Sequence, residues 1–188
     1  MKRTTVKRGR GGATGQVPRA GCATARDERT SRGSKRETLF ARANAEWETG
    51  RPRSAYRLFL LGARAGDPGA EHNVGYFYDT GTGVRKNSAR ALLWYKRAFR
   101  HGYAAAAVNI GTMLRDEGRT RESLAWFRRA ASSGDGDADL EIAKVYLRGG
   151  NRARARLHLG KVRRSAVATG GSKEEAALLL KALRALRT

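Results

Sequence analysis

Apolar residues recur along this chain at the spacing of amphipathic helices, in pairs of segments punctuated by glycine. The clearest pair lies between residues 67 and 102. Its apolar positions repeat every three to four residues, as one buried face of a helix requires. They are Ala70, Val74, Phe77 and Tyr78 in the first segment and Ala91, Trp94, Tyr95 and Ala98 in the second. The spacing predicts two amphipathic helices joined by a glycine-containing loop.

The ends of these two segments carry residues typical of helix termini. Asp67 followed by Pro68 favours a helix start, and Asn87 is in position to cap the second helix. Gly81 ends the first segment, and Gly102 follows the second, as a C-terminal glycine should.

The same pattern recurs at fixed displacements. The run Trp94–Ala98 reappears 32 positions later as Trp126–Ala130, and Asn73–Gly75 reappears 36 positions later as Asn109–Gly111. A helical pair that recurs in this way indicates a solenoid, in which each unit buries its apolar face against the next. We predict four units, at about 37–66, 67–102, 103–134 and 135–165.

A small residue occupies the middle of each first helix: Ala43, Gly75, Gly111 and Ala143. Glycine inside a helix costs about 1 kcal/mol of propensity relative to alanine. We therefore expect these positions to admit a closely packed second helix.

A last helix is predicted at 172–187, after a loop at 166–171. Ser172 and Glu175 have the spacing of a capping box. Its apolar face would cover the open end of the solenoid, and a free amphipathic helix for another partner is the alternative. That face comprises Ala176, Leu179, Leu180, Leu183 and Leu186.

The second unit is similar to a known repeat. Its pattern Ala70-x-x-x-Val74-Gly75-x-x-Tyr78-x-x-Gly81-x-Gly83-Val84, followed by Ala91-x-x-Trp94-Tyr95-x-x-Ala98, resembles the Sel-one-like repeat (SLR), the longer-looped relative of the tetratricopeptide repeat. The other units look more like plain tetratricopeptide units. The resemblance covers about 130 of the 188 residues. It implies a right-handed α-α superhelix, with first helices lining the concave surface, that serves as an adaptor for protein partners.

Charge is sorted between the two kinds of helix. The net charge is +22, from 39 basic and 17 acidic residues. The first-helix segments hold twelve acidic and three basic residues, whereas the second-helix segments hold 21 basic residues and one acid, Glu122. With the helix placement that the resemblance implies, the convex face is basic. This face is either a solubility feature or an anion-binding surface.

The first 36 residues carry eleven basic and two acidic residues and no hydrophobic period. Such a segment is expected to be disordered. A solvated tail, an arm that touches nucleic acid and an organelle transit peptide are the three interpretations. No apolar run reaches the length of a membrane span and no secretory leader pattern is present, so we expect a cytoplasmic protein.

The sequence offers no evident catalytic chemistry, cofactor or metal site. The single cysteine, Cys22, excludes the disulfide framework on which secreted, enzymatic relatives depend. His72, His101 and His158 lie in separate units and form no recognisable ligand set. Gly81-Thr82-Gly83 lacks the preceding strand and third glycine of a phosphate loop. We expect a protein without enzymatic activity.

Candidate groove residues follow from helical phase. If the apolar face packs inward, the opposite face of the first helices lines the groove. Asn73 and Asn109 stand one repeat apart, where they either bond successive backbone groups of an extended peptide or satisfy each other or water. The groove set is His72, Asn73, Tyr76, Asp79, Asn109, Thr112, Arg115, Glu141 and Lys144, with Phe40, Asn44, Trp47, Val108, Leu140 and Leu147 at further equivalent positions.

Two functions follow as predictions. The first is a scaffold that binds a peptide or protein partner in the groove. The second is weak, sequence-independent binding of nucleic acid or an anionic membrane through the convex face and tail. Trp94, Tyr95, Trp126 and Phe127 are expected in the core and so are not counted as stacking partners. The convex set is Arg90, Arg97, Arg121, Arg128, Arg129 and Arg154.

Overall fold

A computed structural model describes residues 38–185, and every regular element within that range is a helix. The predicted disordered tail, Cys22 and Leu186 lie outside the described residues. A first helix covers 38–48. It is followed by α2 (Pro52–Arg64), α3 (Pro68–Thr80), α4 (Ser88–Arg100), α5 (Ala105–Asp116), α6 (Thr120–Ser132), α7 (Ala138–Arg148), α8 (Arg152–Arg164) and α9 (Gly170–Ala185).

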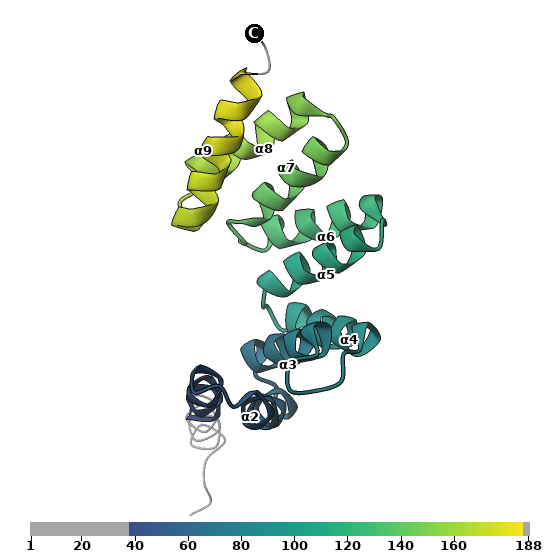
Figure 1. Cartoon of the computed structure of the whole chain (residues 1–188), viewed down its shortest axis with the longest axis vertical. Coiled ribbons are helices and arrows are strands. Elements are labelled where there is room, and N and C mark those ends of the chain that lie inside the picture. The colour runs from purple at the N-terminus through teal and green to yellow at the C-terminus, as the bar shows by residue number, and fades with distance from the viewer. Residues whose placement is uncertain (1–37, 186–188) are drawn as a thin grey trace, which may run out of the picture.

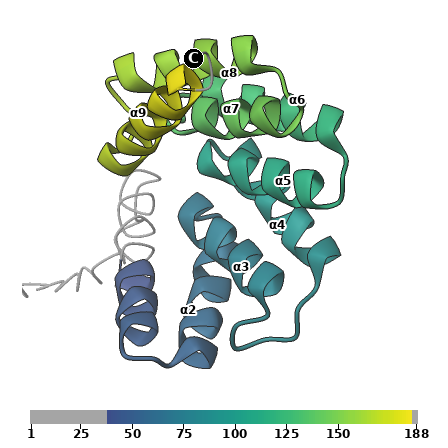
Figure 2. The same cartoon turned by 45° about the horizontal axis from the view of Figure 1, so that its top comes forward.

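The helices form consecutive hairpins that stack into an all-α solenoid (Figure 1). Each helix packs against the next along the chain, and α5 also touches α7. The hairpins follow an arc in which α3, α5 and α7 lie on the inner side and α4, α6 and α8 on the outer side (Figure 2). This placement agrees with the one that the family resemblance implies. Between residues 38 and 185, no helix combines the length and the apolar character needed to cross a membrane.

The predicted caps of α3 and α4 are confirmed. The Asp67 Oδ1 atom accepts a hydrogen bond from the Ala70 backbone N–H at 2.6 Å, and Asn87 Oδ1 accepts one from the Arg90 N–H at 2.9 Å. Gly81 ends α3 with φ +76°, a left-handed conformation that glycine adopts without steric cost.

The predicted role of the small inner residues is also confirmed. A Cβ atom on Gly75 would stand 2.6 Å from the Tyr95 ring, and one on Gly111 would stand 2.5 Å from the Phe127 ring. Only glycine lets these rings lie directly on the backbone of α3 and α5.

The core runs the length of the stack through fully buried aromatic and aliphatic side chains, among them Phe77, Tyr95, Phe127 and Leu159. The expectation that Trp94 and Trp126 are core residues is only half right. Both are half-buried, and each carries an arginine guanidinium on its ring. Leu140, expected in the groove, is 3% exposed and packs in the core instead.

The start of α9 differs from the predicted capping box. The helix begins at Gly170, and the Thr169 hydroxyl accepts the Ser172 N–H, so Thr169 is the capping residue. Asp137, from the turn before α7, in turn accepts the backbone N–H of Thr169 at 2.9 Å. Ser172 lies inside the helix, and Glu175 pairs with Lys144 at 3.0 Å instead of capping.

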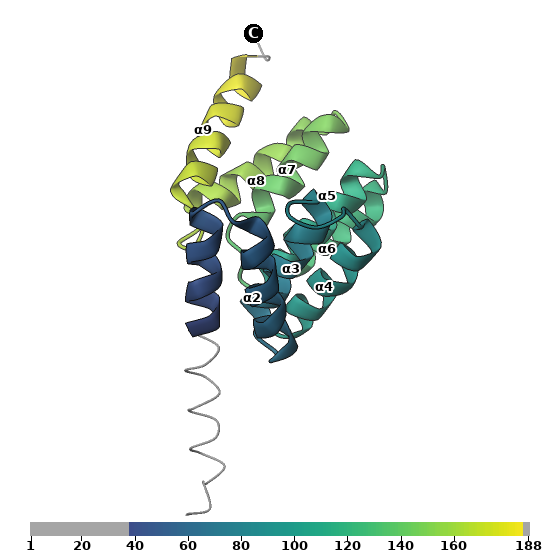
Figure 3. The same ribbon diagram turned by 60° about the horizontal axis from the view of Figure 1, so that its bottom comes forward.

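The predicted covering role of α9 is confirmed. Its buried side chains, Ala176 and Leu183, join a cluster with Leu140, Leu159 and Val162 at the last hairpin. Figure 3 shows α9 lying against α8 at this end of the stack.

Candidate partner-binding groove

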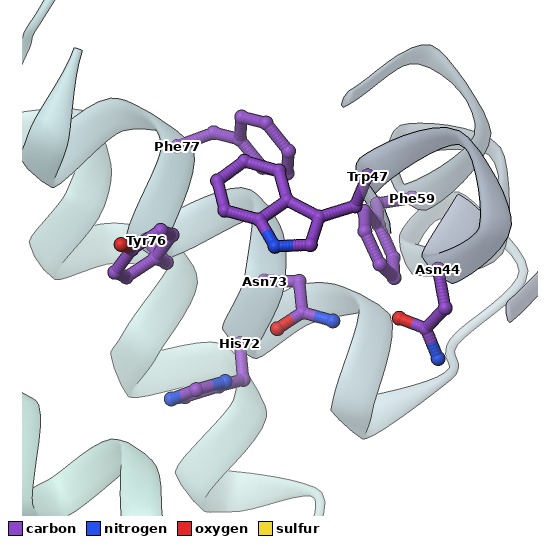
Figure 4. A pocket seen from close by; sticks show the side chains of 7 residues that line it. All are labelled: Asn44, Trp47, Phe59, His72, Asn73, Tyr76 and Phe77. Carbon is purple, nitrogen blue, oxygen red and sulfur yellow. The ribbon is translucent and has the colours of Figure 1, made fainter. Parts of the chain in front are cut away.

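A pocket opens on the inner side of the first two units, between the 38–48 helix and α3. It has a volume of about 280 Å³. Ligand pockets for whole small molecules are typically about 300–1,000 Å³, so the volume of this one lies just below that range. Its lining comprises Asn44, Trp47, Phe59, His72, Asn73, Tyr76 and Phe77 (Figure 4).

Aromatic rings form one wall of the pocket. Trp47 meets Tyr76 edge-to-face at 6.1 Å and Phe77 at 5.3 Å. Phe77 is buried, but Trp47 and Tyr76 are each 40% exposed. Two large aromatic residues that stay open to solvent beside one concavity are the residue types enriched at binding hot spots.

Two amides stand beside these rings. Asn44, on the 38–48 helix, and Asn73, on α3, both extend into the space below the Trp47 indole (Figure 4). Both are half-buried. An amide side chain offers two donors and an acceptor, the set that pairs with a peptide backbone.

The two asparagines one repeat apart do not bond each other in the structure. The Asn109 Nδ2 atom donates to His72 Nε2 at 2.8 Å, so the imidazole stands between α3 and α5. Because Nε2 accepts, the proton of the neutral ring belongs on Nδ1, which is buried without a hydrogen-bond partner among the described residues. Burial lowers the pKa of His72, and the neighbouring Asn73 opposes that shift only in part.

Asp79, on α3, is half-buried close to the core phenol Tyr95. Tyr95 lies under Gly75 and is fully buried, and burial followed by the charge of Asp79 raises its pKa. Burial likewise raises the pKa of Asp79, which Lys86 opposes. Thr112 lies on α5 between Asn109 and Arg115 and is half-buried.

The predicted basic residues of the groove belong to an ion-pair network. The Arg115 Nη1 atom lies 2.5 Å from Glu141 Oε2, and the Lys144 Nζ atom lies 3.0 Å from Glu141 Oε1. Lys144 also pairs with Glu175 on α9. Burial lowers the pKa of Lys144, but its bonds to Glu175 and Glu141 outweigh burial and raise it. These charges neutralise one another and join α5, α7 and α9, so they offer a partner little free charge.

One arginine of the convex set, Arg97, is paired with a buried carboxylate. Glu71 is 0% exposed, and its carboxylate lies 2.5 Å from Arg97 Nε and 2.8 Å from His101 Nδ1. Arg97 also donates to the Ala63 carbonyl. The sequence pattern did not predict that Glu71 is buried while other acidic residues are exposed. Its position directly after the buried Ala70 is the one local signal.

The remaining members of the convex set are exposed on the outer helices. They are Arg90, Arg121, Arg128, Arg129 and Arg154. Within residues 38–185, none of the five has a carboxylate within 4 Å. Three of them instead contact aromatic rings. Arg90 and Arg154 lie over tyrosines of the preceding inner helices, which local sequence patterns did not predict, and Arg129 lies over Trp126 of its own helix.

The histidines do not converge on a common site. His101 bonds Glu71, whereas His158 Nδ1 bonds Asp139 at 2.6 Å in the last hairpin. In the part of the chain that the structure describes, no three histidine, cysteine or acidic side chains gather as a metal site would require.

Comparison with known proteins identifies the repeat. A family model described as the Sel1 repeat matches residues 68–103 and 104–135, which are the α3–α4 and α5–α6 hairpins. The second match corrects the expectation that the third unit is a plain tetratricopeptide unit. An uncharacterised protein of Neisseria meningitidis is 29% identical over 96 residues, 51% of this chain and 20% of its own length. A putative sel1-like repeat-containing protein of Acanthamoeba polyphaga mimivirus is 26% identical over 79 residues, 42% of this chain and 15% of its own.

Solved structures agree with these matches. A Sel1 repeat protein from Oxalobacter formigenes superposes with a TM-score of 0.62 at 23% identity, over 79% of this chain and 64% of that one. A protective antigen of uropathogenic Escherichia coli with an SLR fold superposes with a TM-score of 0.59 at 25% identity. The superposition covers 74% of this chain and 32% of that one. This chain thus spans a fifth or less of the curated relatives and under two thirds of the solved ones. The two central hairpins match the Sel1 repeat, and the chain shares the fold of solved Sel1-like repeat proteins.

Proposed function

We propose that this protein is a non-catalytic scaffold that holds a peptide or protein partner in its inner groove. The observation that carries the proposal is the pocket between the 38–48 helix and α3, where Trp47 and Tyr76 stay exposed beside Asn44 and Asn73. Burying two such rings against a partner side chain supplies the apolar contact, and the amides supply backbone hydrogen bonds. Repeat proteins of this class typically present their concave surface to partners.

Contacts within the groove narrow the set of residues that we propose for binding. The Asn109 amide is bonded to His72, and Arg115 and Lys144 are neutralised by Glu141 and Glu175. The binding residues we propose are therefore those of the first two units. The partner feature that fits them is an aromatic or large aliphatic side chain on an extended segment.

A selection of displayed random peptides against the full chain tests this proposal. We expect enriched peptides to share an aromatic or large aliphatic residue. Their dissociation constant should rise roughly tenfold or more with Tyr76→Ala, as truncation of a hot-spot residue does. Asn44→Ala and Asn73→Ala should each weaken binding less.

Leu178→Ala is the matched control, because Leu178 is 68% exposed on α9, away from the pocket. It should leave affinity unchanged. Peptides that bind wild type and Tyr76→Ala equally well, with both proteins shown to be folded by circular dichroism, would place the binding surface elsewhere.

A second candidate function is binding of an anionic partner by the outer helices. The observation that favours it is that Arg90, Arg121, Arg128, Arg129 and Arg154 are exposed with no acidic partner among the described residues. Phosphate-bearing nucleic acid and anionic membrane surfaces both match this chemistry, and binding to either should fall steeply with salt.

A further inference from the structure

Three exposed arginines of the outer helices stack on aromatic rings. The guanidinium carbon of Arg90 lies 5.5 Å from the Tyr78 ring centre, that of Arg129 lies 4.6 Å from Trp126, and that of Arg154 lies 5.5 Å from Tyr146. All are within the range of a cation–π contact, which is about 6 Å. Arg97 makes a fourth stack, on Trp94, but its guanidinium is bound to the buried Glu71.

The stacks are of two kinds, each of which recurs along the chain. Arg90 and Arg154 lie near the starts of α4 and α8, and each covers a tyrosine near the end of the preceding inner helix. Arg129 lies near the end of α6 and covers Trp126 of the same helix, the contact that Arg97 makes with Trp94 in α4. Arg128 adds a hydrogen bond from Nη2 to the Tyr146 hydroxyl at 3.1 Å, which joins the third unit to the fourth.

A stacked guanidinium presents a specific surface to a ligand. One of its faces is used by the ring, and in Arg90 the Nη1 atom also donates to the Tyr78 hydroxyl at 3.4 Å. The opposite face and the other N–H groups stay available. A planar base can stack on the free face, and the edges can bond a phosphate oxygen in bidentate fashion. The ring beneath also limits rotation of the arginine, so less side-chain entropy is lost on binding.

The shape of the outer surface discriminates among polyanions. The outer helices follow the curve of the stack (Figures 2 and 3), so a flat bilayer or a straight duplex contacts them over a short stretch. A flexible single strand can follow the curve and bring its bases onto successive arginines. Stacking also has no counterpart in a phospholipid headgroup or in a closed duplex, where the bases are already stacked.

We propose that the outer face of α4, α6 and α8 binds single-stranded nucleic acid, with bases on Arg90, Arg129 and Arg154 and phosphates on neighbouring arginines such as Arg121 and Arg128. The proposal rests on the second candidate function. Binding is expected to be insensitive to the nucleotide sequence, because every base has a face that can stack on a guanidinium.

The test separates stacking from charge. A triple variant, Arg90→Lys/Arg129→Lys/Arg154→Lys, keeps the net charge but removes the planar groups. The matched control, Arg100→Lys/Arg152→Lys/Arg163→Lys, changes three exposed arginines of α4 and α8, none of which contacts a ring in the described structure. Thermal unfolding should show both full-chain variants folded.

Anisotropy titrations would use 20-nucleotide single-stranded RNA, the same sequence as DNA, and its duplex, alongside vesicles containing phosphatidylserine, at about 50 and 200 mM salt. We expect both single strands to bind more tightly than duplex or vesicles. The stacking variant should lose roughly tenfold or more in affinity for single strands, because lysine offers no planar group on which a base can stack, while the control loses less than about twofold. The RNA and DNA arms show which source of single strand is preferred.

Equal losses in the two variants would overturn the stacking proposal, as would duplex or vesicle binding as tight as single-strand binding. In those cases the broader anion-binding function stands. Absence of binding to every probe at the lower salt would overturn both.

Discussion

Gly75 and Gly111 show how a single residue sets the distance between two helices. Alanine would gain about 0.5–1 kcal/mol of helix propensity at either position. Its methyl group, however, would overlap with ring atoms of Tyr95 or Phe127. Overpacking of this kind typically costs about 1–3 kcal/mol. We therefore predict that Gly111→Ala lowers the free energy of unfolding measured by urea titration.

Gly160, inside α8, provides the control for this prediction. A Cβ atom there meets only the flexible Arg164 guanidinium, at 3.4 Å. Gly160→Ala should therefore leave stability unchanged or raise it by up to about 1 kcal/mol. If both alanine variants prove equally stable, the ring contact does not limit the packing of α5.

His72 links stability to pH in a direction that its burial determines. Because burial lowers its pKa in the folded state, the unfolded chain binds a proton more readily below its ordinary pKa of about 6.5. Neutral His72 therefore makes its full contribution to the free energy of unfolding above that pH. The contribution falls as pH decreases below it, by at most about 1.4 kcal/mol per pH unit.

A His72→Gln variant isolates this effect, since glutamine keeps a polar partner for Asn109 but does not titrate. Unfolding free energies measured between pH 7.5 and 5 should fall more steeply for wild type than for the variant. Parallel curves would mean that the folded and unfolded pKa values of His72 are alike.

At the scale of elements, α9 stabilises the last hairpin through a few buried side chains. Leu183 is 4% exposed within the cluster of Leu140, Leu159 and Val162, whereas Leu178 on the same helix is 68% exposed. Truncation of a buried leucine to alanine costs about 2–5 kcal/mol. We predict a loss in that range for Leu183→Ala, and a change below about 0.5 kcal/mol for Leu178→Ala, in thermal or urea unfolding.

The same helix shows where local sequence reasoning succeeds and where it fails. The apolar spacing predicted the buried face of α9. In α3 and α4, the caps at Asp67 and Asn87 were predicted from residue type, because a cap depends on neighbours within one turn. The start of α9 did not follow, since the contact that places Thr169 comes from Asp137, 32 residues away. The bond between His72 and Asn109, 37 residues apart, was missed for the same reason.

At the scale of the molecule, the two kinds of helix divide two surfaces between them. Exposed rings and amides gather at one end of the inner side, while exposed arginines lie on the outer side, five of them with no carboxylate within 4 Å among the described residues. The acidic residues Glu141 and Glu175 of the groove pair with Arg115 and Lys144. They therefore do not neutralise the excess positive charge of the outer helices. Mutations on one surface are therefore expected to leave binding at the other intact.

The packing pattern also predicts how the whole chain responds to local damage. Helices pack mainly against their neighbours in sequence, so stability in such a stack is a sum of units and nearest-neighbour interfaces. In hydrogen exchange, Leu183→Ala should accelerate exchange in α8 and α9, and more weakly in α7, which is joined to α9 by the Lys144–Glu175 pair. Exchange in α3 and α4 should match wild type. An equal acceleration in every helix would instead show that the solenoid opens as one cooperative unit.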